Sequence, residues 1–80
     1  MDAIEIEGKV KKILGDKLSL ETDKIDINAR LREDLGMDSF GSIEIAFELE
    51  DAFGIKIPDE DIMKVVIVKD VVDYIKARTA

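Results

Sequence analysis

Apolar residues at helical spacing constrain this chain most, because each such segment has one apolar face that must be buried. In the first segment Ile6, Val10 and Leu14 recur every four residues with lysines between them, which predicts a helix over Ala3–Leu18. A chain of 80 residues is about half the usual length of roughly 150 residues per domain. We therefore expect one domain over residues 1–80, with one small core.

Three further segments are predicted to be helical. One runs over Ser39–Ala52 and ends before Gly54, where a left-handed residue is favoured. A short helix is expected over Asp59–Lys64, and a last one over Val68–Arg78, whose final turn holds the basic residues that a helix C-terminus prefers. The apolar face of the Ser39–Ala52 helix is expected to consist of Phe40, Ile43, Ala46, Phe47 and the following Phe53.

Two stretches have weaker helical patterns. Between Ser19 and Met37 the periodicity fades, which predicts a long loop held to the core by spaced apolar anchors: Leu20, Ile25, Ile27, Leu31 and Leu35. A connection this long is usually functional in a small domain. The β-branched residues of Val65–Val68 favour a strand, so pairing with Ile55–Ile57 is the alternative to helix there. In the first helix, Gly8 and Gly15 each weaken the prediction by about 1 kcal/mol relative to Ala.

Composition excludes several functions. Twelve basic against nineteen acidic residues give a net charge of −7, which disfavours nucleic acid and anionic membranes as partners. The chain contains neither Cys nor His, so it lacks thiolate metal sites, a thiol of its own and the side chain that titrates near neutral pH. We expect no catalysis, no metal site and no membrane insertion. Because the sequence shows neither a signal-peptide pattern nor a long apolar run, we expect a cytoplasmic monomer.

The negative charge is concentrated in the middle of the chain. Residues 33–61 contain ten acidic residues and only Lys56 as a base, whereas residues 1–32 contain seven of each sign. Glu44, Glu48 and Asp51 are spaced to share one helix face without a lysine of the same helix beside them. Such a stripe can serve solubility alone or can dock basic patches on other proteins. Its concentration in one third of the chain favours docking.

Ser39 follows Asp38 at the predicted start of the second helix. Most serines at such a position are N-caps. Alternatively, the hydroxyl accepts a phosphate-linked group, because the free N–H groups of a helix start stabilise an anion. Residue type and position alone favour the cap.

The surroundings of Ser39 resemble the acyl carrier proteins over nearly the whole chain. The stretch Leu35-Gly-Met-Asp-Ser39 is followed at a fixed distance by the acidic segment Ile57-Pro-Asp-Glu-Asp61. The resemblance implies an all-α, small four-helix bundle with three longer helices and a short third one. It also implies a non-catalytic carrier whose 4′-phosphopantetheine is joined to Ser39 through a phosphodiester. A phosphopantetheinyl transferase adds this group from coenzyme A with magnesium, and its thiol holds acyl chains as thioesters.

The resemblance assigns further roles residue by residue. Asp38 is the neighbour that assists modification. The surface read by acyl-processing enzymes with basic docking patches comprises Phe40, Glu44, Glu48, Asp51, Asp59, Glu60 and Asp61. The residues that flank an acyl chain tucked inside are Ile43, Phe47, Ile62 and Tyr74, for which ordinary core packing is an equal explanation.

Three residues depart from the family pattern. Phe40 stands where the family has Leu, Gly41 where it often has Asp, and Ile67 where Ser or Thr commonly caps the last helix. Phe40 and Gly41 lie on the partner surface, which suggests a specialised carrier in place of the housekeeping protein of fatty acid synthesis. Two alternatives stay open: a carrier of aminoacyl or peptidyl units, such as D-alanine, and an acidic interaction module that is never modified.

Overall fold

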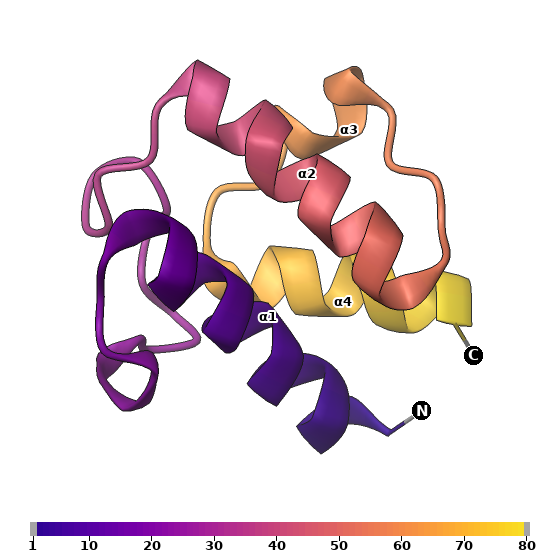
Figure 1. The fold of residues 1–80 in the computed structure, drawn as a ribbon, viewed down its shortest axis with the longest axis horizontal. Coiled ribbons are helices and arrows are strands. Elements are labelled where there is room, and N and C mark those ends of the chain that lie inside the picture. Colours follow the sequence, from indigo (N-terminus) through magenta and orange to yellow (C-terminus); the bar gives the residue numbers. More distant parts are fainter. Residues whose placement is uncertain (1, 80) are drawn as a thin grey trace.

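The computed structural model describes residues 2–79. The chain forms α1 (Ala3–Leu18), the 3-10 helix η1 (Thr22–Lys24), α2 (Ser39–Phe53), α3 (Asp59–Ile62) and α4 (Val68–Thr79), as Figure 1 shows. Residues 2–79 contain no strand. The predicted all-α bundle with a short third helix is confirmed. The bounds of α1 are those expected, α2 and α4 each extend one residue further, and α3 ends two residues earlier.

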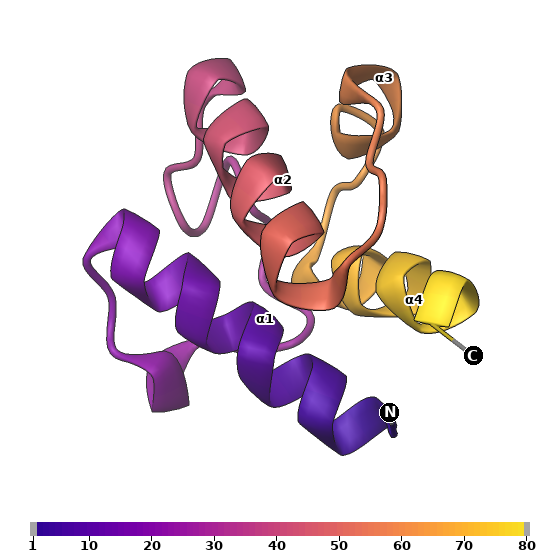
Figure 2. The ribbon, with the colours of Figure 1, turned by 45° about the vertical axis from the view of Figure 1, so that its right-hand side comes forward.

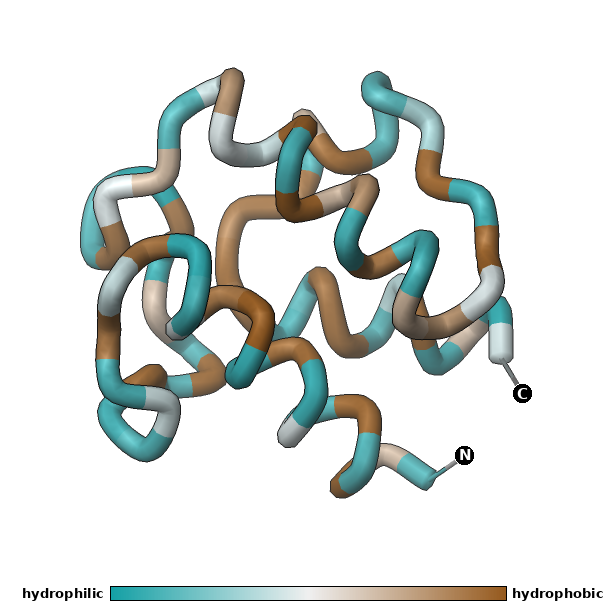
Figure 3. The backbone as a smooth tube through the Cα atoms, viewed as in Figure 1, coloured by the Kyte–Doolittle hydropathy of each residue, from teal (hydrophilic) through white to brown (hydrophobic). Residues whose placement is uncertain are grey.

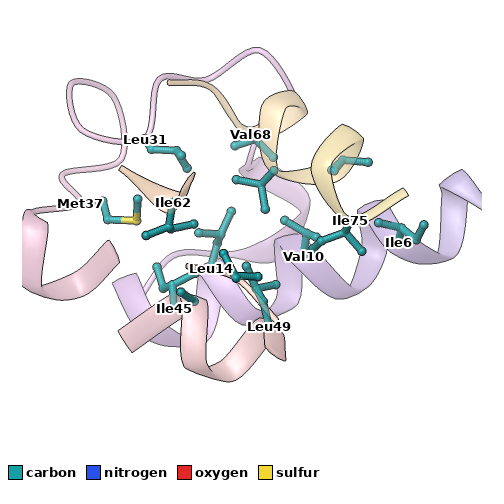
Figure 4. Packing of buried hydrophobic residues seen from close by; sticks show 14 of the residues in the cluster. Ile6, Val10, Leu14, Leu31, Met37, Ile45, Leu49, Ile62, Val68 and Ile75 are labelled. Atoms are coloured by element: carbon teal, nitrogen blue, oxygen red, sulfur yellow. The ribbon is translucent and has the colours of Figure 1, made fainter. Parts of the chain in front are cut away.

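The helices pack around one core. α1 packs against both α2 and α4, and α3 packs against α2. Figure 2 shows α3 on the side of α2 that faces away from α1. Along each helix apolar residues recur between polar ones (Figure 3). The buried apolar side chains come from all four helices and from the loops, and Figure 4 shows most of them: Ile6, Val10, Leu14, Ile25, Leu31, Met37, Ile45, Ala46, Leu49, Ile57, Ile62, Val68, Val71, Val72 and Ile75.

Aspartate side chains cap the starts of α1 and α2, at Asp2 and Asp38, and α3 has no side-chain cap. The Asp2 carboxylate accepts the N–H of Glu5 over 2.9 Å, and Gly54 closes α2 with a left-handed φ of 65°. At the start of α4, Ile67 has no side-chain acceptor of its own. The Asp70 carboxylate instead accepts the N–H groups of Val66 and Ile67, at 2.9 and 3.1 Å. Both N–H groups precede α4, so the Asp70 carboxylate does not substitute for a Ser or Thr cap, whose oxygen accepts N–H groups of the first turn.

Gly15 is required by the chain that follows α1. Ser19 adopts a left-handed φ of 59°, and the N–H of Leu20 donates to the carbonyl oxygen of Gly15. A Cβ at residue 15 would lie 2.8 Å from the carbonyl oxygen of Leu20, closer than such atoms approach. The glycine that weakened the helix prediction therefore allows the loop to fold back over the end of α1.

The long loop before α2 is anchored by some of the predicted residues. Ile25 and Leu31 are buried, and Ile27 and Leu35 pack against the core, but Leu20 is exposed, so its prediction as an anchor was wrong. The loop also forms backbone hydrogen bonds with the segment before α4, including Leu31 N–H to Val66 C=O at 2.9 Å.

The proposed strand pairing of Val65–Val68 with Ile55–Ile57 is wrong. Within residues 2–79 the Val65–Val68 segment makes one isolated bridge, between Ile67 and Arg30 in the long loop. Val68 is already the first residue of α4 and donates its N–H to the carbonyl oxygen of Ala29. The β-branched residues are extended because the loop pairs with them, and this contact joins the two segments that flank α2 and α3.

The buried face of α2 differs from the expected one. Ile45, Ala46 and Leu49 are buried together with Ser42, whereas Phe40 and Phe47 are 71% and 62% exposed. Ser42 can be buried because its hydroxyl donates to the carbonyl oxygen of Asp38 over 2.9 Å. Phe40 and Phe47 therefore lie on the opposite, solvent-facing side of this helix, whereas Ala46 is buried and Phe53 packs against the core, as expected.

Candidate functional site

Asp38 performs the capping that leaves Ser39 available. The Asp38 carboxylate accepts the N–H of Gly41 over 2.6 Å, so it is the N-cap of α2. Ser39 is the first residue of the helix, and it is exposed. Its hydroxyl oxygen receives one long contact, 3.5 Å from Arg32 Nη1. The hydroxyl of Ser39 is therefore free of the structural role that its position alone suggested.

The segment before Ser39 is held in place by a turn and a buried side chain. Gly36 adopts a left-handed φ of 74°, which favours glycine. Next to it Met37 is 5% exposed, and its N–H donates to the carbonyl oxygen of Leu31 over 2.9 Å. Met37, which the loop pattern did not single out, fixes the approach to the helix start.

Arg30 and Asp34 form a tight turn upstream. The Asp34 carboxylate accepts the backbone N–H of Arg30 at 2.8 Å, and the Arg30 guanidinium lies 3.4 Å away. The backbone hydrogen bond, followed by the guanidinium, lowers the pKa of Asp34 below its ordinary value. Arg30 also pairs with Glu33. These contacts order the loop that leads to Met37 and Ser39.

The solvent-facing side of α2 combines acidic and aromatic side chains. Phe40, Glu44, Phe47 and Asp51 recur at helical spacing, and Glu48 lies beside them. α2 itself supplies no lysine beside these acidic residues, but Lys17 of α1 lies 3.3 Å from Glu44. Glu48 and Asp51 are exposed, and none of the ion pairs within residues 2–79 involves them.

The three acidic residues of α3 differ in their surroundings. Asp59 and Glu60 are exposed. Asp61 is half-buried, and its carboxylate accepts the Tyr74 hydroxyl over 2.7 Å and lies 3.8 Å from Arg78. Burial, followed by this hydrogen bond, raises the pKa of Tyr74. Asp61 therefore joins α3 to α4, a structural role that differs from its expected role on the partner surface.

A small apolar cavity lies between α2, α3 and α4. Its volume is about 10 Å³, and its lining consists of Leu49, Ile57, Asp61, Ile62, Val65, Val71, Tyr74 and Ile75. This volume is about that of one water-sized probe. Of the four residues expected beside an acyl chain, Ile62 and Tyr74 line the cavity and Ile43 does not. Phe47 was placed wrongly in the interior, because the opposite face of α2 is the buried one.

The comparisons with known proteins agree with this site. Residues 8–75 match the family model described as Phosphopantetheine attachment site. The acyl carrier protein of Thermosynechococcus vestitus is 42% identical to this chain over 80 residues, covering 100% of this chain and 99% of that protein. The chain belongs to the acyl carrier protein family. The acyl carrier proteins of two Rickettsia bellii strains are 44% and 45% identical over 71 residues, which cover 89% of this chain and 83% and 88% of theirs.

Membership in this family confirms the predicted non-catalytic carrier with a covalent 4′-phosphopantetheine. The residues around Ser39 fit that group. The exposed hydroxyl is not used as a cap, and the Arg32 guanidinium lies 3.5 Å from it, where a cation would suit the negative charge of a phosphodiester. Within residues 2–79 there is no helix long and apolar enough to cross a membrane, and no cluster of His, Cys, Asp or Glu suited to a metal ion.

Sequence reasoning missed Arg32, Lys17 and most of the cavity lining. Arg32 and Ser39 come together only because the loop turns at Gly36. Lys17 and Glu44 lie on two separate helices that pack together. A helical wheel of one segment cannot show such pairs. The one available signal was that Arg32 directly precedes the most acidic part of the chain.

Proposed function

We propose that the Ser39 hydroxyl carries the 4′-phosphopantetheine and that the chain presents acyl thioesters to enzymes of fatty acid, lipid or polyketide-type biosynthesis. The observation that carries the assignment is the division of roles at the start of α2. Asp38 caps the helix, and the exposed Ser39 hydroxyl serves no structural purpose. The 4′-phosphopantetheine group, called the arm below, supplies the thiol that this Cys-free chain lacks.

The residues around Ser39 prepare the hydroxyl for modification. The cap by Asp38 fixes the first turn of α2, whose N–H groups and positive dipole end favour an anion beside Ser39. Asp38 is also the acidic neighbour that we propose to assist the transferase. Burial of Met37 keeps this turn in place while the Ser39 side chain stays in solvent.

The interior of the bundle supports an acyl cargo over an aminoacyl one. Seven of the eight residues around the cavity have apolar or aromatic side chains, and the carboxylate of the eighth, Asp61, is engaged by Tyr74. An apolar chain gains free energy by entering such a space, whereas a charged amino group loses its hydration there. Because the cavity holds about one water, α3 and α4 must move apart to admit the chain.

We propose that partner enzymes read the outward face of α2 and the exposed start of α3. This docking face consists of Phe40, Glu44, Phe47, Glu48, Asp51, Asp59 and Glu60. Its carboxylates suit the basic patches of a phosphopantetheinyl transferase and of acyl-processing enzymes. Its two exposed aromatic rings supply the apolar contacts that dominate interface energies. Asp61 is excluded, because two groups of α4, the Tyr74 hydroxyl and Arg78, contact its carboxylate, whereas Glu44 has the single partner Lys17.

The test is loading by a broad-specificity phosphopantetheinyl transferase with coenzyme A and magnesium, followed by intact-mass measurement. Wild type should gain one arm, and Ser39→Ala should gain none. Ser19→Gly is the matched control, because Ser19 is an exposed serine whose left-handed φ suits glycine. An arm on Ser39→Ala would overturn the assignment, and so would a wild type that several transferases fail to load.

A further inference from the structure

Arg32 is the arginine without an ion-pair partner within residues 2–79. Of the three arginines, Arg30 pairs with Glu33 and Asp34, and Arg78 pairs with Asp61 and covers the Tyr74 ring. Arg32 makes neither kind of contact. Its Nη1 lies 3.5 Å from the Ser39 hydroxyl oxygen and its Nη2 lies 3.4 Å from the Met63 sulfur. Both contacts are long and involve uncharged groups, so they leave the charge of this guanidinium uncompensated.

The position of Arg32 matters because Ser39 lies in the most acidic part of the chain. Residues 33–61 contain ten acidic residues and one base. The carboxylate nearest in sequence, that of Asp38, already caps α2, the helix that begins at Ser39. A phosphodiester on Ser39 adds another negative charge beside it. Arg32 is the cation that the structure places within reach of the Ser39 hydroxyl.

A guanidinium is well suited to such an anion. Its planar set of N–H donors binds phosphate oxygens through charge-assisted hydrogen bonds, which are stronger than the neutral contacts that Arg32 makes here. The Met63 contact holds one end of the guanidinium near the end of α3 while the other end faces Ser39. Arg32 can therefore exchange its hydroxyl contact for a charged one without leaving its place.

We propose that Arg32 is a positioning residue that binds the phosphate of the arm on Ser39 and fixes how the arm leaves α2. This inference rests on the proposed attachment at Ser39. It extends that proposal by adding a cation. The first turn of α2 offers the phosphate only N–H groups, and Arg32, seven residues before Ser39, supplies a positive charge.

The test compares the apo and arm-bearing proteins by ¹H–¹⁵N spectra of the arginine side chains, after intact mass has shown that loading is complete. The Arg32 Nε–H signal should shift on loading, while the signals of Arg30 and Arg78 stay in place. Thermal melts at low ionic strength give the melting temperature of the loaded form minus that of the apo form. This difference should be smaller for Arg32→Gln than for wild type.

Arg30→Gln is the matched control, since it removes an arginine two residues away whose partners are Glu33 and Asp34. For Arg30→Gln, the difference in melting temperature between the loaded and apo forms should equal that of wild type. Raised salt should bring this melting-temperature difference in wild type closer to that in Arg32→Gln, because salt screens exposed charges. Complete loading with an unshifted Arg32 signal, or equal effects of Arg32→Gln and Arg30→Gln, would overturn the inference. Failure to gain the arm at all would instead overturn the assignment of Ser39.

Discussion

Replacing Leu49 by alanine should weaken the fold and also report where an acyl chain is held. Leu49 is fully buried and lines the small cavity between α2, α3 and α4. Truncation of a buried leucine lowers the free energy of unfolding by about 2–5 kcal/mol. A chain of this size has a stability of about 4–12 kcal/mol, and each kcal/mol shifts the melting temperature by about 4–8 °C. We expect the apo variant to melt at least about 8 °C lower than wild type.

The enlarged cavity should then be filled by the acyl chain. The substitution removes roughly three carbon atoms, and each buried CH₂ contributes about 0.8 kcal/mol, so a chain that occupies the space recovers about 2 kcal/mol. Thermal melts by circular dichroism on the apo, arm-bearing and octanoyl-loaded forms measure this recovery. Acylation should therefore stabilise Leu49→Ala more than it stabilises wild type.

Leu14→Ala is the matched control. Leu14 is also fully buried, but it belongs to α1 and does not line the cavity. Its truncation should lower the apo melting temperature by a similar amount without any additional recovery on acylation. Leu49→Val serves if Leu49→Ala is unfolded at room temperature. Equal recovery of the α1 and cavity variants, or none in either, would refute the placement of the acyl chain.

Three further predictions concern the surface, the start of α2 and pH. Reversing Glu48 and Asp51 to lysine should slow association with a cognate enzyme several-fold and flatten its salt dependence, as stopped-flow kinetics would show; unchanged kinetics would leave these acids a solvated face. Gly41→Ala should raise the melting temperature, but its gain in free energy of unfolding should be below the value of about 1 kcal/mol that helix propensity gives. The reason is that the new Cβ would lie 3.1 Å from the capping oxygen of Asp38. A lower melting temperature would show that this cap cannot adjust. Since the folded-state pKa of Asp34 is lowered, its contribution to stability is present above the unfolded value of about 4 and is lost as pH falls through the folded value. Asp34→Asn should therefore be less stable than wild type at neutral pH, and the difference should narrow in acid; a constant difference in urea titrations across that range would contradict the assignment.

The sequence predicted the helices well because their signals are local. Periodic apolar residues in both helices, and Gly54 after the last turn of α2, mark α1 and α2 without reference to the rest of the chain. The buried face of α2 was predicted only in part, because Ala46 and Phe53 pack in or against the core but Phe40 and Phe47 are exposed. Ser42 lies on the buried face, where its hydroxyl donates to the carbonyl oxygen of Asp38, and apolar periodicity does not indicate such a buried polar residue.

The remainder of the site depends on contacts between separate segments. Ser39 was a candidate from its motif, but its freedom from capping could only be seen once Asp38 was found to bind the N–H of Gly41. The Asp61–Tyr74 hydrogen bond joins two helices, and it removes Asp61 from a surface that its sequence neighbours share. Local patterns indicate which residues are present at a site, and packing determines which of their atoms remain available.

The most direct test of the central claim is mass spectrometry of the protein purified from its own host. We expect the peptide that contains Ser39 to carry one 4′-phosphopantetheine, and a fraction of it to bear an acyl group that hydroxylamine releases, as it does from thioesters. An unmodified Ser39 in all preparations, an arm on another serine, or an aminoacyl cargo in place of an acyl chain would contradict the account.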